Sequence, residues 1–160
     1  FCKKRAAGCY GQIWSWHETT KIINDSGKNY NLYVRWRWEN ACQFDNRIDE
    51  FKSIVKNFAY NTDDYAGWME DSNILTAYPV LIENTMQDTF FILKKIIIDD
   101  NFYTTLNNVV TKNLPERHSA HELWYQYLKE LDYTIAAGLP NIRTTIIKDN
   151  YERPNKDWDI

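Results

Sequence analysis

Residues 14–38, WSWHETTKIINDSGKNYNLYVRWRW, contain the strongest strand pattern in the chain. Apolar and polar side chains alternate on both sides of a polar turn around Gly27, and Trp, Tyr, Val, Ile and Thr are frequent. Period-two alternation of these residue types is typical of β-strands, and two such runs joined by a polar turn are typical of a hairpin. The stretch predicts an antiparallel hairpin in which Ile22 lies opposite Leu32 and Trp16 opposite Trp38.

This register divides the hairpin into an apolar and a polar face. Each Trp buries a large area, and an exposed row of them would promote aggregation, so the apolar face is expected in the core. It consists of Trp14, Trp16, Ile22, Leu32, Val34, Trp36 and Trp38. The polar face presents His17, Tyr33, Arg35 and Arg37, which we expect to point outward as a candidate partner-binding surface.

Several later segments place apolar residues at helical spacing. Asp45 and Asp100 stand where they would cap two of these helices, and Ser119-x-x-Glu122 is a capping box at the start of the strongest one. Helices are therefore predicted over residues 45–58, 74–78, 101–112 and 119–137.

Residues 79–98 also favour a helix, but the apolar run at 89–98 fits a buried strand as well, since short apolar runs do not distinguish the two. Residues 141–149, NIRTTIIKD, alternate weakly and predict a third strand that joins the hairpin. Residues 150–160 are expected to be extended.

These elements predict an α+β fold, with the hairpin packed on a layer of about four helices. The 160 residues are expected to form a single globular domain. It divides into a hairpin region (1–44), a helical region (45–138) and a possible strand with an extended tail (139–160).

Composition limits the classes of function. The net charge is −3, so binding to nucleic acid, which draws on clustered Lys and Arg, is not expected. The longest apolar run is far shorter than a membrane-spanning helix, so membrane insertion is not expected either. Oligomeric state is left open.

Three cysteines, Cys2, Cys9 and Cys42, lack the CxxC spacing of a zinc site. A bond between Cys2 and Cys9 would suit an exported chain, whereas reduced thiols would suit the cytoplasm. The sequence leans toward a cytoplasmic location, and a secreted mature chain is the alternative.

No catalytic or cofactor motif is present: the chain has neither a G-x-S-x-G nucleophile elbow nor a glycine-rich phosphate loop. We therefore predict no cofactor, no metal and no assigned catalytic residue. The candidates for an alternative, a small hydrolase, are His17, His118, His121 and Glu122, because histidine titrates near neutral pH.

A second candidate docking surface is acidic. Asp63, Asp64, Glu70 and Asp71 cluster around Trp68, where a basic partner could bind. Small size, acidity and the absence of catalytic motifs favour a non-enzymatic protein that binds another protein, of the toxin-neutralising immunity or inhibitor type. The weaker alternative is binding of RNA or carbohydrate through the Arg and His side chains of the hairpin.

Overall fold

The protein has an α+β fold, as the sequence predicts. The computed structural model describes residues 3–37, 40–43, 47–60, 71–76, 84–114, 119–139 and 143–146. Within these ranges the helices are α1 (Lys3–Asp25), α2 (Ile48–Tyr60), α3 (Phe102–Asn108), which continues as the π-helical turn η1 (Val109–Asn113), and α4 (Ala120–Glu130). The strands are β1 (Tyr33–Trp36), β2 (Asn40–Gln43), β3 (Ile74–Thr76), β4 (Phe90–Leu93), β5 (Ile135–Ala137) and β6 (Arg143–Ile146).

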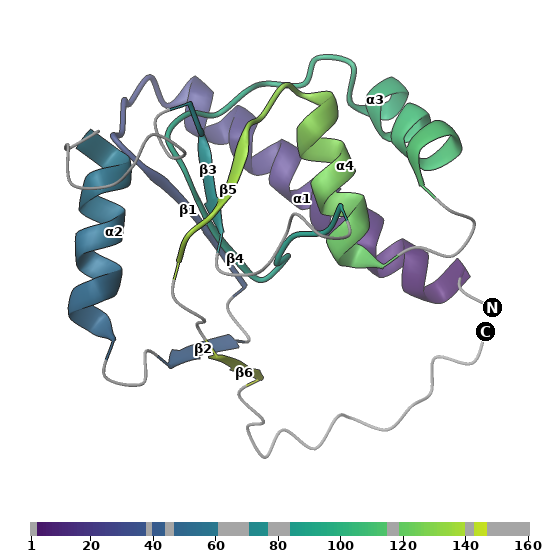
Figure 1. Cartoon of the computed structure of the whole chain (residues 1–160). Coiled ribbons are helices and arrows are strands. Elements are labelled where there is room, and N and C mark those ends of the chain that lie inside the picture. Colours follow the sequence, from purple (N-terminus) through teal and green to yellow (C-terminus); the bar gives the residue numbers. More distant parts are fainter. Residues whose placement is uncertain are drawn as a thin grey trace, which may run out of the picture.

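Four strands form a mixed sheet between two layers of helices (Figure 1). Their order is β1-β4-β3-β5, with β3 and β5 parallel and the other neighbours antiparallel. Helix α2 covers one face, α1 and α4 cover the other, and α3 lies beyond α4 (Figure 1). Strands β2 and β6 form a separate two-stranded ribbon.

Alternate residues of the central strand point into two separate cores. Phe90 and Ile92 pack with Phe58 of α2, whereas Phe91 and Leu93 pack in the core that α1 and α4 share. All four residues of β4 are buried, because both faces of the sheet are covered. This explains why the sequence around 89–98 lacks alternation.

The predicted hairpin is wrong in its first arm, since residues 14–25 belong to helix α1. Ile13, Trp16 and Thr20, spaced three and four residues apart, are all buried, whereas Trp14 and Ile22 are 48% and 70% exposed. The segment thus contains both a period-two and a helical pattern. Helical burial against α4 and the sheet decides between them, since the Trp16 ring contacts Trp124 of α4 and Phe91 of β4.

The second arm is a strand, as predicted, but with a different partner and reversed faces. Strand β1 pairs with β4, so that Arg35 lies opposite Phe91 and Trp36 opposite Phe90. Tyr33 and Arg35 therefore point toward α1 and α4, and Val34 and Trp36 point to the other side. Trp38 lies outside the described residues.

Among the other elements, the helices predicted over 45–58 and 101–112 are confirmed as α2 and as α3 with η1. Asp45 lies outside the described residues. Asp100 is not the cap of α3: the N-cap is Asn101, and Asp99 accepts hydrogen bonds from the Asn101 backbone N–H (3.1 Å) and the Thr105 hydroxyl (3.0 Å).

Two helix predictions are wrong and a third is too long. Ile74–Thr76 is strand β3, and residues 90–93 of the predicted 79–98 helix form β4, which is the alternative that the sequence left open. Helix α4 has the predicted capping box but ends at Glu130, and Ile135–Ala137 is strand β5. The predicted strand over 141–149 contains β6, which pairs with β2 rather than with the predicted hairpin. Residues 150–160 lie outside the described part.

Candidate functional site

Three polar side chains from distant parts of the chain meet near the start of α4. The carboxylate of Asp88, just before β4, lies 3.4 Å from Nη1 of Arg37 and 3.3 Å from Nδ1 of His121. The Asp88 side chain is only 6% exposed, compared with 32% for Arg37 and 51% for His121. The arrangement is thus a buried anion that holds two partly exposed groups at the surface.

The backbone fixes the orientation of the His121 ring. Nδ1 lies 2.8 Å from the Met86 carbonyl oxygen, and the Met86 N–H donates in turn to the His121 carbonyl oxygen (3.3 Å). A carbonyl only accepts hydrogen bonds, so Nδ1 carries the proton and Nε2 is an acceptor in the neutral ring. This is the tautomer in which a carboxylate-oriented histidine works as a general base.

Helix α4 positions His121 because its first turn is rigidly capped. The Ser119 hydroxyl accepts from the Glu122 backbone N–H (3.2 Å), and the Glu122 carboxylate accepts from the Ser119 N–H (2.6 Å). The carboxylate of Glu122, a candidate catalytic residue in the sequence, is therefore used in the cap. His118, the neighbouring candidate, lies outside the described residues.

A second surface feature lies on the α2 side of the sheet. Val34 and Trp36 are each 55% exposed, and Ile48 in the first turn of α2 is 39% exposed. Trp36 is the register partner of Phe90, whose ring lies 6.2 Å from that of Phe51. We call the apolar surface formed by Val34, Trp36 and Phe51, which lie on the side of the sheet that α2 covers, the β1–α2 surface.

The predicted outward position of Arg35 and Tyr33 is wrong. The Arg35 guanidinium lies 4.4 Å from the ring centroid of Trp124 and 5.5 Å from that of Phe91, and it donates to Oε1 of Gln12 (3.2 Å). Arg35 thereby joins β1 to α1 and α4. Tyr33 packs against the core that these two helices share.

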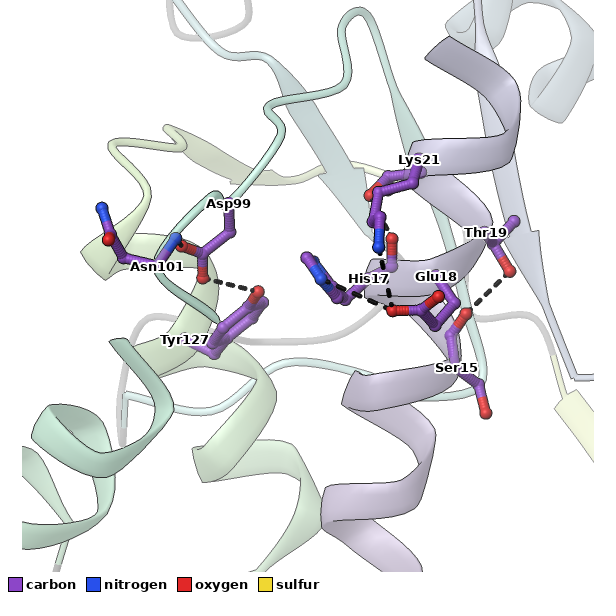
Figure 2. A network of polar contacts seen from close by, with 9 residues as sticks. Ser15, His17, Glu18, Thr19, Lys21, Asp99, Asn101 and Tyr127 are labelled. Carbon is purple, nitrogen blue, oxygen red and sulfur yellow. Dashed lines mark hydrogen bonds and ion pairs between the residues drawn. The ribbon is translucent and has the colours of Figure 1, made fainter. Parts of the chain in front are cut away.

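His17 is also turned inward, between α1 and α3. Figure 2 shows its ring beside Glu18, whose carboxylate lies 3.6 Å from Nε2. Apart from this pair, Figure 2 shows Tyr127, whose hydroxyl donates to the Asp99 carboxylate (3.0 Å). The His17 side chain is only 12% exposed and stacks on Phe102 at 4.5 Å, which points to a structural role.

The remaining sequence candidates therefore separate into three groups: a pair that meets through one carboxylate, a set that is turned inward, and the acidic cluster. Arg37 and His121 meet through Asp88; His17, Tyr33 and Arg35 are turned into the packed layers. His17 and His121 share no ion-pair or hydrogen-bond partner among the described residues. Asp71 is exposed, and the rest of the acidic cluster, Asp63, Asp64 and Glu70, lies outside the described residues.

Sequence reasoning missed Asp88, which is one of 22 acidic residues and follows no motif. Within the described residues, no three His, Cys, Asp or Glu side chains are grouped so that they could hold a metal ion. In the same part of the chain, none of the helices has the length and apolarity needed to cross a membrane. The side chains of Cys2 and Cys42 are not described.

Comparisons of the chain with protein-family models, with curated proteins and with solved structures found no match.

Proposed function

We propose that this is a non-enzymatic protein that binds another protein, of the immunity or inhibitor type, and that the β1–α2 surface is its binding site. The observation that carries the proposal is the exposure of Val34 and Trp36, each at 55%, on one face of β1. Trp and large aliphatic residues clustered at a surface are favourable for binding because their burial in a complex removes apolar area from water.

The position of this surface in the sheet supports a macromolecular partner. Helix α2 covers Phe90 and Ile92 of β4, but their register partners Trp36 and Val34 stay exposed on the same face. A partner that presents an apolar segment beside α2 would complete this face of the sheet. Arg37 directly follows β1, and its side chain is 32% exposed, so it could pair with an acidic group of the partner.

The test uses a binding partner isolated from native lysate and then purified. Its affinity is measured by calorimetry for the unaltered chain, for Trp36→Ser and for Trp14→Ser. Trp14 is a matched control, since it is 48% exposed but lies on α1, away from the β1–α2 surface. We expect Trp36→Ser to weaken binding by about tenfold or more and Trp14→Ser to leave it nearly unchanged.

Two results would overturn the proposal. The first is equal loss, or no loss, of affinity in the two variants. The second is a self-associating chain whose dimer dissociates in Trp36→Ser, because the surface would then be an interface between copies. The melting temperature of each variant, measured alongside, separates loss of binding from loss of fold.

A second candidate function is favoured by the Asp88–His121 pair. With Nδ1 held by the Met86 carbonyl and faced by the Asp88 carboxylate, Nε2 of His121 has the orientation of a general base in a small hydrolase. If this function applies, hydrolysis of a substrate in an ester and amide panel is expected to disappear in His121→Ala and to fall in Asp88→Asn. Activity that survives His121→Ala would exclude it.

A further inference from the structure

We infer that a cavity at the C-terminal end of α1 binds a phosphorylated small molecule with an apolar or aromatic body. The cavity has a volume of about 400 Å³ and lies between the turn that follows α1, strand β1 and the segment that follows β4. Ligand sites in proteins typically have volumes of about 300–1,000 Å³, so the space suits a small molecule rather than a polymer.

The charge of the lining is the main argument. Lys28, Lys94 and Lys95 line the cavity, and no Asp or Glu is among the described residues that line it. This is unexpected in a chain whose net charge is −3. Lysines that converge from separate segments create a positive potential, and ammonium groups bind phosphate as point charges.

The lysines are not all explained by stability of the fold. Lys28 lies close behind α1, where a cation is favourable for the helix dipole, but Lys94 and Lys95 come from the end of β4. The Lys94 ammonium lies 4.7 Å from the ring centroid of Phe58 on α2, a cation–π contact that directs its charge toward α2, so the positive charge of the cavity comes mainly from Lys28 and Lys95. Lys28 and Lys95 are exposed, so they can reach a ligand without a large desolvation penalty.

The turn that carries Lys28 is well defined. Gly27 has φ +64°, a conformation that favours glycine, and its N–H donates to the Asn24 carbonyl oxygen (3.0 Å). The Lys28 N–H donates to the Ser26 hydroxyl (3.3 Å). These bonds hold the backbone from which Lys28 and Asn29 face the cavity.

The rest of the lining indicates the body of the ligand. Ile23, Ile96 and Ile98 supply apolar walls, and Tyr33 adds an aromatic ring. Asn24 and Asn29 contribute amide groups that can both donate and accept hydrogen bonds. A ligand that places an anionic group near the lysines and a flat or apolar body against these walls would contact both the charged and the apolar part of the lining.

The experiment measures binding of ADP, inorganic pyrophosphate and adenosine to the full chain by calorimetry. We expect ADP to bind more tightly than pyrophosphate, and both to bind more tightly than adenosine. The double variant Lys28→Ala, Lys95→Ala is expected to weaken ADP binding by about tenfold or more, and NaCl raised from about 50 mM to about 200 mM is expected to weaken it further.

Lys112→Ala is the matched control, since Lys112 is an exposed lysine on η1 outside the cavity. Both altered lysines of the double variant are exposed, so its melting temperature is expected to match that of the unaltered chain. The inference fails if ADP and pyrophosphate do not bind, if adenosine binds as well as ADP, or if the double variant and Lys112→Ala bind ADP equally. Trp36→Ser should bind ADP normally, which keeps this test separate from the protein-binding proposal.

Discussion

Arg35 places a positive charge between β1 and the helix layer, where it contacts aromatic rings from two elements. Its guanidinium stacks on Trp124 and Phe91 and donates to Gln12. A planar guanidinium suits this position because it stacks on ring faces while its N–H groups remain available as donors. The charge therefore contributes to packing as well as to hydrogen bonding.

Replacing this group by a carboxylate should destabilise the fold. Arg35→Glu removes the stacking and leaves an anion against the faces of two aromatic rings, so we expect the free energy of unfolding to fall by roughly 2 kcal/mol or more. Urea denaturation followed by Trp fluorescence measures this. Lys28→Glu is the control, because Lys28 is exposed; its effect should stay within about 0.5 kcal/mol. Equal stability of the two variants would show that the Arg35 stack contributes nothing.

At the same scale, residue types identify only part of the candidate site. His121 and Arg37 are recognisable because histidine and arginine are the usual groups for proton transfer and anion binding. Asp88 is not recognisable, because its pairing with Arg37 joins positions 51 residues apart and exists only once β1 lies beside β4. The direction in which Arg35 points depends on the same pairing.

At the scale of elements, the end of α4 shows how one residue decides a boundary. Asp132 has φ +56°, which stops the helix, and the Tyr133 N–H then donates to the Leu128 carbonyl oxygen (3.0 Å). Apolar Ile135 continues the helical spacing, so the sequence pattern alone extends α4 to residue 137. In the structure, this apolar residue belongs to β5, where it pairs with Ile74 of β3.

Glycine at this boundary should stabilise the protein. Asp132→Gly relieves the strain of a left-handed conformation, and we expect the free energy of unfolding to rise by roughly 0.5–1 kcal/mol. Lys129→Gly places the same residue inside the helix, so it should lower that free energy by about 1 kcal/mol. Chemical denaturation of both variants provides the comparison. A lower free energy of unfolding for Asp132→Gly would mean that the Asp132 side chain stabilises the fold by more than its left-handed backbone conformation destabilises it.

Residues 14–25 show the limit of pattern reasoning for a whole element. The period-two spacing of Trp14, Trp16 and Ile22 and the helical spacing of Ile13, Trp16 and Thr20 share one residue, so local sequence does not separate them. Strand β4, whose four residues are all buried, pairs with β1 in the place that the first arm would take in a hairpin. That pairing is nonlocal and leaves the first arm to form α1.

At the scale of the whole molecule, buried tyrosine hydroxyls link the layers around α4. Tyr127 donates to the Asp99 carboxylate (3.0 Å), and Tyr133 accepts from the Ile97 N–H (2.7 Å). Burial raises the pKa of Tyr133 to about 12, and burial together with the Asp99 carboxylate raises the pKa of Tyr127 as well. These two hydrogen bonds thus connect the segment before α3 to α4 and to the residues that follow α4.

These shifts predict how stability depends on alkaline pH. Because the pKa of each tyrosine is higher in the folded state than its unfolded value of about 10, the unfolded chain loses these protons first as pH rises. The stabilisation is fully present below about pH 10 and is lost progressively above it. We expect the free energy of unfolding, measured by urea titration, to fall steadily between about pH 10 and about pH 12.

Two phenylalanine variants identify the source of this dependence. Tyr133→Phe removes one titrating group, so the fall of the unfolding free energy with rising pH should become shallower, although its value at neutral pH also drops because the Ile97 N–H loses its acceptor. Tyr103→Phe should leave the pH dependence unchanged, since Tyr103 is 77% exposed. If the slope of the unfolding free energy against pH is the same in Tyr133→Phe as in the unaltered chain, other groups cause the alkaline loss of stability. A phenol that contributes nothing to this slope must ionise equally in the folded and the unfolded chain.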